Sequence, residues 1–337
     1  MSKLKFAILG CGRISYKHVE ALINNNDEAE LVALCDITEE KSIQRKEQYD
    51  SEISNSDVKI YTDYIEMLKN EDIDVVTIAT ESGYHAKHAL DCINHGSHVL
   101  IEKPMALSVE DADQIIALAK EKEKKVCVSH QNRFNPPIQK LRRAIEEGRF
   151  GRLINGTARI LWTRDNNYYK QAPWRGTKEL DGGTLMNQCI HNIDLLQWMM
   201  GSEIVRIHSE RDTFLRDIEM EDFGAILIRF KNGSIGIVEG SACVYPKNLE
   251  ETLSIFGEKG TVVIGGLAVN EIKTWQFADE KDYDNEVGNT EIDSVYGEGH
   301  TPLYKDFIDA INNHTEPLIN GEEGKKAMEI ILRAYES

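Results

Sequence analysis

The stretch FAILGCGRISYKH, residues 6–18, decides the fold of this chain. An apolar run of strand character ends in a Gly-Cys-Gly turn, and a helical pattern begins directly after it. Gly10 permits a tight turn, and Gly12 lets the backbone approach a pyrophosphate at the positive end of the helix. Ser15 stands at the third small position, where Gly or Ala is usual. The stretch predicts a dinucleotide-binding turn.

Working outward, short apolar runs alternate with amphipathic stretches through the first 130 residues. Such continuous apolar strands, alternating with helices, indicate a parallel sheet covered on both faces. The expected strands are residues 4–10, 30–36, 58–63, 73–80, 98–103 and 125–130. We therefore predict a doubly wound α/β (Rossmann) domain over residues 1–125.

The alternation of strands and helices stops after about residue 150, where runs of strand character are joined by hairpin turns such as KNGS and EKGT. Helical patterns occur at residues 136–148, 183–201, 301–314 and 322–335. The remainder, residues 126–337, is predicted to be an α+β domain with an open, mainly antiparallel sheet. An open sheet leaves one face bare, and a second copy of the chain could cover it, so we expect a homodimer or homotetramer.

Composition excludes several classes of partner. The net charge of −18 disfavours nucleic acid and anionic membrane surfaces. No segment approaches the roughly 20 apolar residues of a membrane helix. The six cysteines are widely spaced without a CxxC pair, which indicates reduced thiols and a cytoplasmic protein.

Asp36 ends the second expected strand, in LVALCD. A carboxylate there accepts hydrogen bonds from ribose hydroxyls and repels a 2′-phosphate, which favours NAD over NADP. Arg45 is the nearest downstream arginine, but it lies well inside the next expected helix. The alternative role for Asp36 is that of a helix N-cap, which Thr38 could also provide.

The segment HVLIEKPMALS, residues 98–108, places Lys103 at the carboxyl end of the fifth strand, before Pro104. Ligands of open α/β sheets bind at this edge, so Lys103 is predicted to reach the reacting centre. Burial and a cationic nicotinamide would lower its pKa and suit it to proton transfer. The alternative is a simple pair with Glu102. The predicted cofactor-binding residues follow strand ends, and they are Gly10, Gly12, Arg13, Ile14, Asp36, Thr80, His85, Glu102 and Lys103.

A second segment with candidate site residues is DGGTLMNQCIHNIDLLQWMMG, residues 181–201. On a helix, Asn187, His191 and Asp194 would share one face. An amide and an imidazole presented together predict a site for a hydroxyl substrate, with His191 as the second catalytic residue. The alternative is a core histidine hydrogen-bonded to Asp194.

Arginines in Asn-, Tyr- and Trp-rich segments flank this helix in the sequence. Guanidinium groups bind carboxylate and phosphate in paired geometry, and aromatic faces suit sugars and uracil. Together with Lys103, the predicted substrate-binding residues are Arg133, Arg164, Tyr168, Trp174, Arg175, Asn187 and His191. His300 and Tyr304 are weaker candidates for the same cleft, and no metal ion is expected.

The combination of GCGRIS, Asp36, IEKP and the GG…H helix resembles the glucose–fructose oxidoreductase / inositol dehydrogenase (Gfo/Idh/MocA) family over essentially the whole chain. The resemblance implies that Lys103 and His191 are catalytic and that the peptide before Pro104 is cis. Many members have Asp four residues before the histidine, where this chain has Asn187. An amide cannot exchange protons, so Asn187 can only hold a hydroxyl or orient the ring.

A narrower resemblance is to bacterial dehydrogenases of UDP-N-acetyl-2-amino-2-deoxyglucuronate, carried by SHQNRFNPPIQKLRRAI, RDNNYYKQAPWRGT and the 181–201 segment. It implies NAD-dependent oxidation of the sugar's 3-hydroxyl for cell-surface polysaccharide precursors, with 2-oxoglutarate as a reoxidant of NADH. The alternatives are a dehydrogenase of inositol, another polyol or a free sugar, and a non-catalytic regulator that binds the cofactor.

Overall fold

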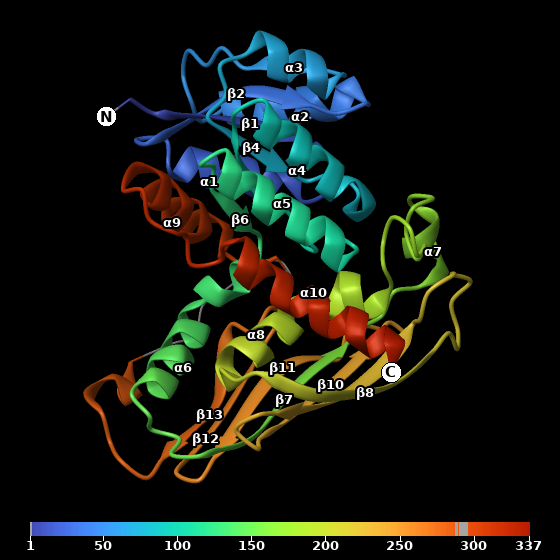
Figure 1. Ribbon diagram of the computed structural model, residues 1–337, viewed down its shortest axis with the longest axis vertical. Helices are drawn as coiled ribbons and strands as arrows, with labels where there is room; N and C mark the ends of the chain where they lie inside the picture. The colour runs from blue at the N-terminus through green and yellow to red at the C-terminus, as the bar shows by residue number, and fades with distance from the viewer. Residues whose placement is uncertain (1, 287–288, 290–295) are drawn as a thin grey trace. The chain divides into compact units, whose positions relative to one another are not determined.

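The computed structural model describes residues 2–286, 289 and 296–337, and the chain forms two compact units (Figure 1). Unit 1 consists of Met1–His130 and His300–Lys325, and unit 2 consists of Gln131–Gly299 and Lys326–Ser337. The fold class is the predicted one: a Rossmann domain and an α+β domain. The division differs from the predicted one at 125/126, because residues 300–325 belong to unit 1.

The return of the chain to unit 1 has a packing cause. Helix α9 (His300–Asn312) contacts α1 (Ser15–Asn24) and fully buries Leu303 and Phe307. Beyond it, the Val128 amide donates to the Ile319 carbonyl at 2.9 Å. A helical pattern in one sequence shows that a helix has an apolar face but not which sheet that face covers, so the predicted boundary placed α9 in the wrong domain.

The sheet of unit 1 is six-stranded and parallel, in the order β3-β2-β1-β4-β5-β6. Its strands are β1 (Leu4–Leu9), β2 (Ala29–Cys35), β3 (Lys59–Tyr61), β4 (Val75–Ile78), β5 (His98–Ile101) and β6 (Val126–Val128). The other helices of unit 1 are α2 (Glu39–Asp50), α3 (Tyr64–Asn70), η1 (Ser82–Tyr84), α4 (His85–Asn94) and α5 (Val109–Glu121). All of β4 and most of β1 and β5 are buried, as expected for strands covered on both faces.

The sheet of unit 2 has seven strands in the order β13-β12-β11-β7-β10-β9-β8. They are β7 (Leu153–Leu161), β8 (Ile204–Asp212), β9 (Phe223–Phe230), β10 (Ile235–Ser241), β11 (Glu250–Gly257), β12 (Gly260–Gly265) and β13 (Glu271–Phe277). β7 and β10 pair in parallel and the other neighbours are antiparallel. The helical elements are η2 (Gln131–Phe134), α6 (Pro136–Glu146), α7 (Asn166–Lys170), η3 (Leu185–Cys189), α8 (Ile190–Met200) and η4 (Asp282–Asn285). Helix α10 (Gly321–Glu336) begins in unit 1 and continues into unit 2.

Helix α8 packs on β7, β10 and β11 at close range (Figure 1). A Cβ atom at Gly156 would lie 2.7 Å from Leu196, and one at Gly240 would lie 2.6 Å from the Cys189 sulfur, so both strands need glycine beneath the helix. On the opposite face, Leu227 and Ile237 are paired across β9 and β10 and are 48% and 39% exposed. One face of this sheet is therefore covered by α8, and the other exposes apolar side chains.

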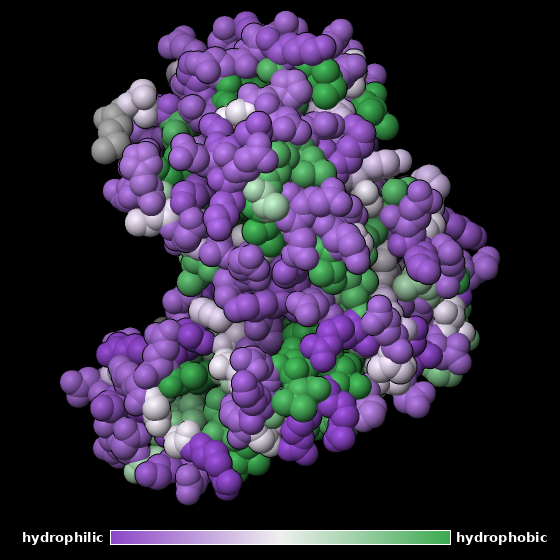
Figure 2. Space-filling view, viewed as in Figure 1, coloured by the Kyte–Doolittle hydropathy of each residue, from purple (hydrophilic) through white to green (hydrophobic). Residues whose placement is uncertain are grey.

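The surface and the cysteines agree with the composition. The face of unit 1 drawn in Figure 2 is mostly hydrophilic. All six cysteines are free thiols. Within the part of the chain that the structure describes, no helix combines the length and the apolar character needed to cross a bilayer.

Candidate active site

The turn after β1 has the geometry that its glycines predict. Gly10 has φ +96°, and a Cβ atom there would lie 2.5 Å from the Ala79 carbonyl carbon. Gly12 has no atom within 4 Å of its would-be Cβ, so its backbone faces open space. Ser15 donates to the Gly12 carbonyl at 2.7 Å, which gives the unusual third residue a role inside the turn. This turn can receive a pyrophosphate at the start of α1.

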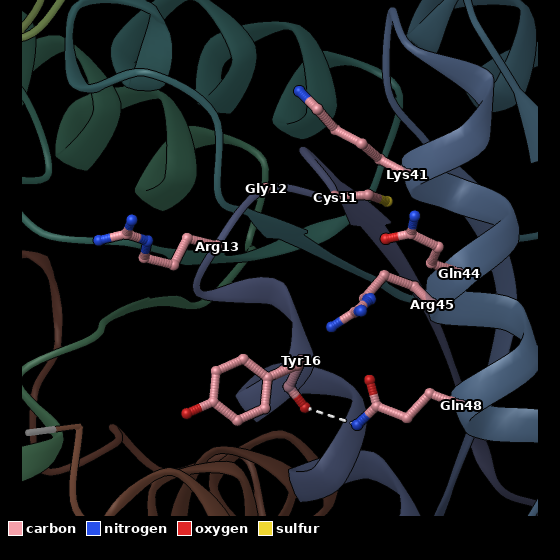
Figure 3. Close-up of a pocket in the computed structure, with 8 residues that line it drawn as sticks. All are labelled: Cys11, Gly12, Arg13, Tyr16, Lys41, Gln44, Arg45 and Gln48. Carbon is pink, nitrogen blue, oxygen red and sulfur yellow. Dashed lines mark hydrogen bonds between the residues drawn. The ribbon is translucent and has the colours of Figure 1, made fainter. Parts of the chain in front are cut away.

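Asp36 lies beside this turn at the end of β2. Its two carboxylate oxygens accept from the amides of Cys11 (2.8 Å) and Thr38 (2.9 Å), and Lys41 lies 3.6 Å away. A pocket of about 710 Å³ adjoins them, and Figure 3 shows that Arg45 of α2 points into it. Arg45 lies inside α2, as expected, and its side chain faces the Gly-Cys-Gly turn.

The loops after β4 and β5 are tied together by His85. Its Nδ1 lies 2.7 Å from the Pro104 carbonyl oxygen and its Nε2 lies 3.0 Å from that of Thr80. Burial lowers the pKa of His85, and the two carbonyl contacts oppose this shift. His85 therefore has a structural role, holding Thr80 and the segment after Lys103, and this buried ring does not support the predicted cofactor contact.

Glu102 is also buried, among residues that the sequence did not place with it. Its Oε1 lies 3.1 Å from His18 Nε2 and 3.8 Å from His300 Nε2. Burial alone would raise the Glu102 pKa, but hydrogen bonds from the two histidines outweigh burial and hold the pKa well below its usual range. His18 Nδ1 lies 3.1 Å from the Tyr304 hydroxyl. Glu102, His300 and Tyr304 are thus buried within unit 1, and their mutual contacts favour a structural role for them.

The side chains of His18, Glu102 and His300 are of the types that bind metal ions. One ligand atom each from His18, Glu102 and His300 lie within 4.8 Å of one another, and all three residues are buried. The engagement of His18 Nδ1 with Tyr304, and of Tyr304 with Thr77 at 2.7 Å, describes a hydrogen-bonded chain that needs no cation. We interpret this cluster as the support of the strand end that carries Lys103.

Lys103 follows β5 and is half-buried, and the Lys103–Pro104 peptide is cis, as the resemblance implies. The backbone before it is held by the Glu102 amide, which donates to the Ile78 carbonyl at 2.9 Å. The Lys103 amide lies 3.3 Å from Glu102 Oε2. These contacts fix the backbone from which the Lys103 side chain projects.

In unit 2, His191 is the second residue of α8 and is half-buried. It follows η3, a π-helical turn, where a single continuous α-helix was predicted. The turn begins after Gly182 and Gly183, which have φ +83° and +98°. Because π-helical turns add a residue per turn, the predicted three- and four-residue spacing before His191 does not hold here.

Glu221 supports the start of this turn. Its Oε1 accepts from the Leu185 amide at 2.8 Å and from the Tyr335 hydroxyl at 2.9 Å. The same Tyr335 hydroxyl lies 2.8 Å from the Gly182 carbonyl oxygen, so its single proton is shared between two acceptors. Burial raises the pKa of Glu221 to about 7. The carboxyl is therefore protonated in the folded protein at mildly acidic pH.

This pKa gives a stability prediction for Glu221→Gln. A carboxyl whose pKa is higher in the folded than in the unfolded state contributes stability below the unfolded pKa of about 4.3, and this is lost as pH rises through 7. Glutamine does not titrate, so the unfolding free energy of the variant relative to the wild type should increase from pH 5 to pH 8, by on the order of 2 kcal/mol. Urea unfolding at the two pH values measures this, and a difference that does not change with pH would contradict it.

Asn187, four residues before His191, lies in a polar network. Its amide donates to Asp181 in a short hydrogen bond, and its oxygen accepts from Gln188 Nε2 at 2.7 Å. Asp181 is itself fixed, because its other oxygen accepts from the Gly176 amide at 2.7 Å. The Asn187 side chain is thus oriented, which fits its expected use as a holder of a hydroxyl.

The predicted substrate-binding residues of the 162–175 segment join the same network. Arg175 donates to the Tyr168 hydroxyl at 2.6 Å, and Gln188 donates to that hydroxyl at 3.0 Å. Arg164 donates to Gln188 Oε1 at 3.1 Å. The guanidinium of Arg175 also lies over the rings of Tyr168 and Trp174, at 4.4 and 4.5 Å. Two cations and two aromatic faces therefore gather beside Asn187.

Arg133 does not belong to this group. Its Nε and Nη2 donate to the two oxygens of Asp194 at 2.7 and 2.6 Å, and both side chains are fully buried. The guanidinium also lies 4.8 Å from the ring of Trp198. This geometry favours a structural role over the predicted substrate contact, because the guanidinium is fully buried and one of its edges is paired with Asp194.

Sequence reasoning missed two members of the network, Asp181 and Gln188. Asp181 was not predicted to join the site, although its position before two glycines is typical of a turn residue. Gln188 had no signal of its own, because the π-helical turn that brings it to Tyr168 is not visible in a helical repeat.

Comparison with known proteins places these features in a family. Residues 4–130 match the GFO/IDH/MocA oxidoreductase family with NAD-binding Rossmann fold, and residues 138–263 match the GFO/IDH/MocA C-terminal domain. The WlbA dehydrogenase of Bordetella pertussis, solved with NADH and UDP-GlcNAcA, is 35% identical, with a TM-score of 0.89 and coverage of 100% of this chain and 96% of that one. The chain belongs to the Gfo/Idh/MocA family.

Its relatives in the family act on different alcohols. A second WlbA dehydrogenase, from Chromobacterium violaceum and also solved with NADH and UDP-GlcNAcA, is 36% identical, with a TM-score of 0.89 and coverage of 99% and 93%. The myo-inositol 2-dehydrogenase of Thermotoga maritima is 25% identical over 333 residues, which are 96% of this chain and 93% of the relative. Membership in this family makes the protein an NAD-dependent oxidoreductase that acts on CH–OH groups.

Proposed function

We propose that this protein oxidises a sugar hydroxyl of an anionic nucleotide sugar, with the 3-hydroxyl of UDP-N-acetylglucosaminuronate as the best candidate. The observation that carries the proposal is the gathering of Arg164 and Arg175 around Tyr168, beside Asn187. Two guanidinium groups suit a substrate that carries a carboxylate and a diphosphate. The two WlbA dehydrogenases, solved with UDP-GlcNAcA, support the same substrate class.

The proposed chemistry uses the cofactor turn, Lys103 and His191. NAD⁺, when bound at the Gly10–Gly12 turn and Asp36, supplies the acceptor for the hydride that leaves the carbinol carbon. His191 or Lys103 takes the proton of the substrate hydroxyl, and the other stabilises the developing carbonyl oxygen. An imidazole has the more suitable ordinary pKa, near 6.5. Asn187 holds a substrate hydroxyl, since its amide cannot take the proton.

The rival within the family is a dehydrogenase of inositol or another uncharged polyol, favoured by the inositol dehydrogenase among the relatives. A panel of UDP-sugars and polyols, scored by NADH formation and by thermal protection, separates the two. We expect UDP-N-acetylglucosaminuronate to give both signals. Turnover of inositol with no effect of any UDP-sugar would overturn the proposed substrate.

The arginine cluster gives a second measurable expectation. Arg175→Gln and Arg164→Gln should each raise the KM for the UDP-sugar by roughly 10- to 100-fold, the usual effect of a lost charge-assisted hydrogen bond, with a smaller change in kcat. Arg206→Gln, an exposed arginine of β8, is the matched control and should change neither. If all three variants behave alike, the cluster is not the substrate site.

Three further parts of the proposal concern the setting of the enzyme. The exposed apolar pair Leu227 and Ile237 supports a homodimer or homotetramer formed through the open sheet face, which light scattering can test. Bound NADH that 2-oxoglutarate discharges would support recycling in place. Free thiols at all six cysteines support a reducing compartment such as the cytoplasm, where a role in polysaccharide precursor synthesis would fit.

A further inference from the structure

The cofactor pocket of unit 1 carries an excess of positive charge. It is lined by Cys11, Gly12, Arg13, Tyr16, Lys41, Gln44, Arg45 and Gln48, which include three cations and no carboxylate (Figure 3). In a chain with a net charge of −18, a pocket with this lining is a local exception. Its three cations fit an anionic group better than a neutral ribose hydroxyl.

Two of these cations come from one face of α2. Lys41 and Arg45 are four residues apart and lie on successive turns that face the Gly-Cys-Gly turn, whereas Arg13 points the other way (Figure 3). Arg45 is half-buried, and its Nε is buried without a hydrogen-bond partner among the described residues. A buried guanidinium nitrogen without a partner is costly, which indicates that a ligand atom satisfies it.

Asp36, the residue that favours NAD, already has partners for both carboxylate oxygens within the protein. Both of its oxygens accept backbone amides, and Lys41 lies 3.6 Å from Oδ1. Asp36 marks where the ribose hydroxyls of a bound dinucleotide lie, and the pocket begins at Cys11, whose amide it accepts. A phosphate on the ribose 2′-oxygen would therefore face Lys41 and Arg45 as well as this carboxylate.

We propose that this pocket also receives the 2′-phosphate of NADP(H), so that the protein binds both coenzymes. Arg45 donates to the phosphate with its guanidinium edge, and Lys41 supplies a second charge while it shields Asp36. The inference concerns the coenzyme alone and does not depend on which sugar is the substrate.

The test compares the binding affinities of ligands that do and do not carry a 2′-phosphate, and it does not use turnover. Isothermal titration of the full chain with NAD⁺, NADP⁺, 5′-AMP and 2′,5′-ADP isolates the contribution of the 2′-phosphate. We expect NADP⁺ to bind within about 30-fold of NAD⁺, and 2′,5′-ADP to bind more tightly than 5′-AMP. NADP⁺ binding more than about 1,000-fold weaker than NAD⁺ binding would overturn the proposal.

Variants then assign the phosphate to its ligand. Arg45→Gln should weaken NADP⁺ and 2′,5′-ADP by roughly 10- to 100-fold and leave NAD⁺ within about threefold. Lys46→Gln is the matched control, because Lys46 lies on α2 outside the pocket and is ion-paired with Asp50. Equal weakening of NAD⁺ and NADP⁺ by Arg45→Gln would overturn the proposal, because Arg45 would then serve the diphosphate that both coenzymes share. Equal weakening of NADP⁺ binding by Lys46→Gln and Arg45→Gln would also overturn the proposal, because the effect would then come from the overall charge of α2 and not from a contact of Arg45.

Discussion

Replacing Lys103 with methionine is expected to lower kcat by about 10²- to 10⁴-fold, the contribution usual for a positioned proton-transfer group. Methionine keeps the length and apolar stem of the side chain but removes its amine. The strand end that carries it is fixed by backbone bonds and by the buried Glu102 cluster, so the fold should survive the change. Single-turnover absorbance at 340 nm measures the loss of turnover, and NAD⁺ titration checks that the variant still folds and binds the coenzyme.

His191→Gln should lower kcat to a similar degree, because glutamine keeps a hydrogen-bonding side chain but cannot take a proton at neutral pH. If the two residues serve one proton transfer, the double variant should be little worse than the poorer single variant. NAD⁺ binding should stay within about threefold in each, since transition-state contacts are removed and ground-state contacts are kept. Near-normal turnover in both single variants, with intact folding, would falsify their assignment as catalytic residues.

The features that could be predicted from the sequence are those that depend on residues close together in the chain. The strands of unit 1 are continuous apolar runs, and the turn at Gly10 requires a residue with positive φ, so both are encoded within a few residues of one another. The cluster of Arg164, Tyr168 and Arg175 was also predictable, because these residues are close in the chain. Local patterns therefore predicted the fold and grouped three side chains that do lie together.

What could not be predicted depends on contacts between distant segments. Arg133 and Asp194 are 61 positions apart, so a buried ion pair could not be distinguished from an arginine facing a ligand. Glu102 is held by His18 and His300, from two helices at opposite ends of the chain. The π-helical turn η3 lies where Gly183 approaches Glu221, a residue far along the sequence. Periodicity reports which face of an element is apolar, but it does not report what that face meets.

The buried pair of Arg133 and Asp194 should be among the largest single contributors to the stability of unit 2. Arg133→Met leaves a fully buried carboxylate without its bidentate partner, and breaking such a pair usually costs about 3–5 kcal/mol. Urea unfolding at pH 7 should show this loss in the unfolding free energy. Glu146→Gln is the control: it breaks the ion pair of Arg142 with a glutamate whose side chain is 61% exposed, and it should cost at most about 1 kcal/mol.

The double variant Arg133→Met/Asp194→Leu separates the cost of an unpaired charge from the worth of the pair. Replacing both members of a buried ion pair with apolar groups of similar volume is often nearly neutral, so the double variant should recover most of the stability that Arg133→Met loses. A substrate-binding role for Arg133 predicts the opposite pattern: a raised KM for the UDP-sugar at nearly unchanged stability, with no recovery in the double variant. Because Asp194 lies on α8, three residues after His191, loss of the pair should also reduce kcat wherever it disturbs the helix, and recovery of kcat in the double variant would show that this loss comes from the unpaired charge.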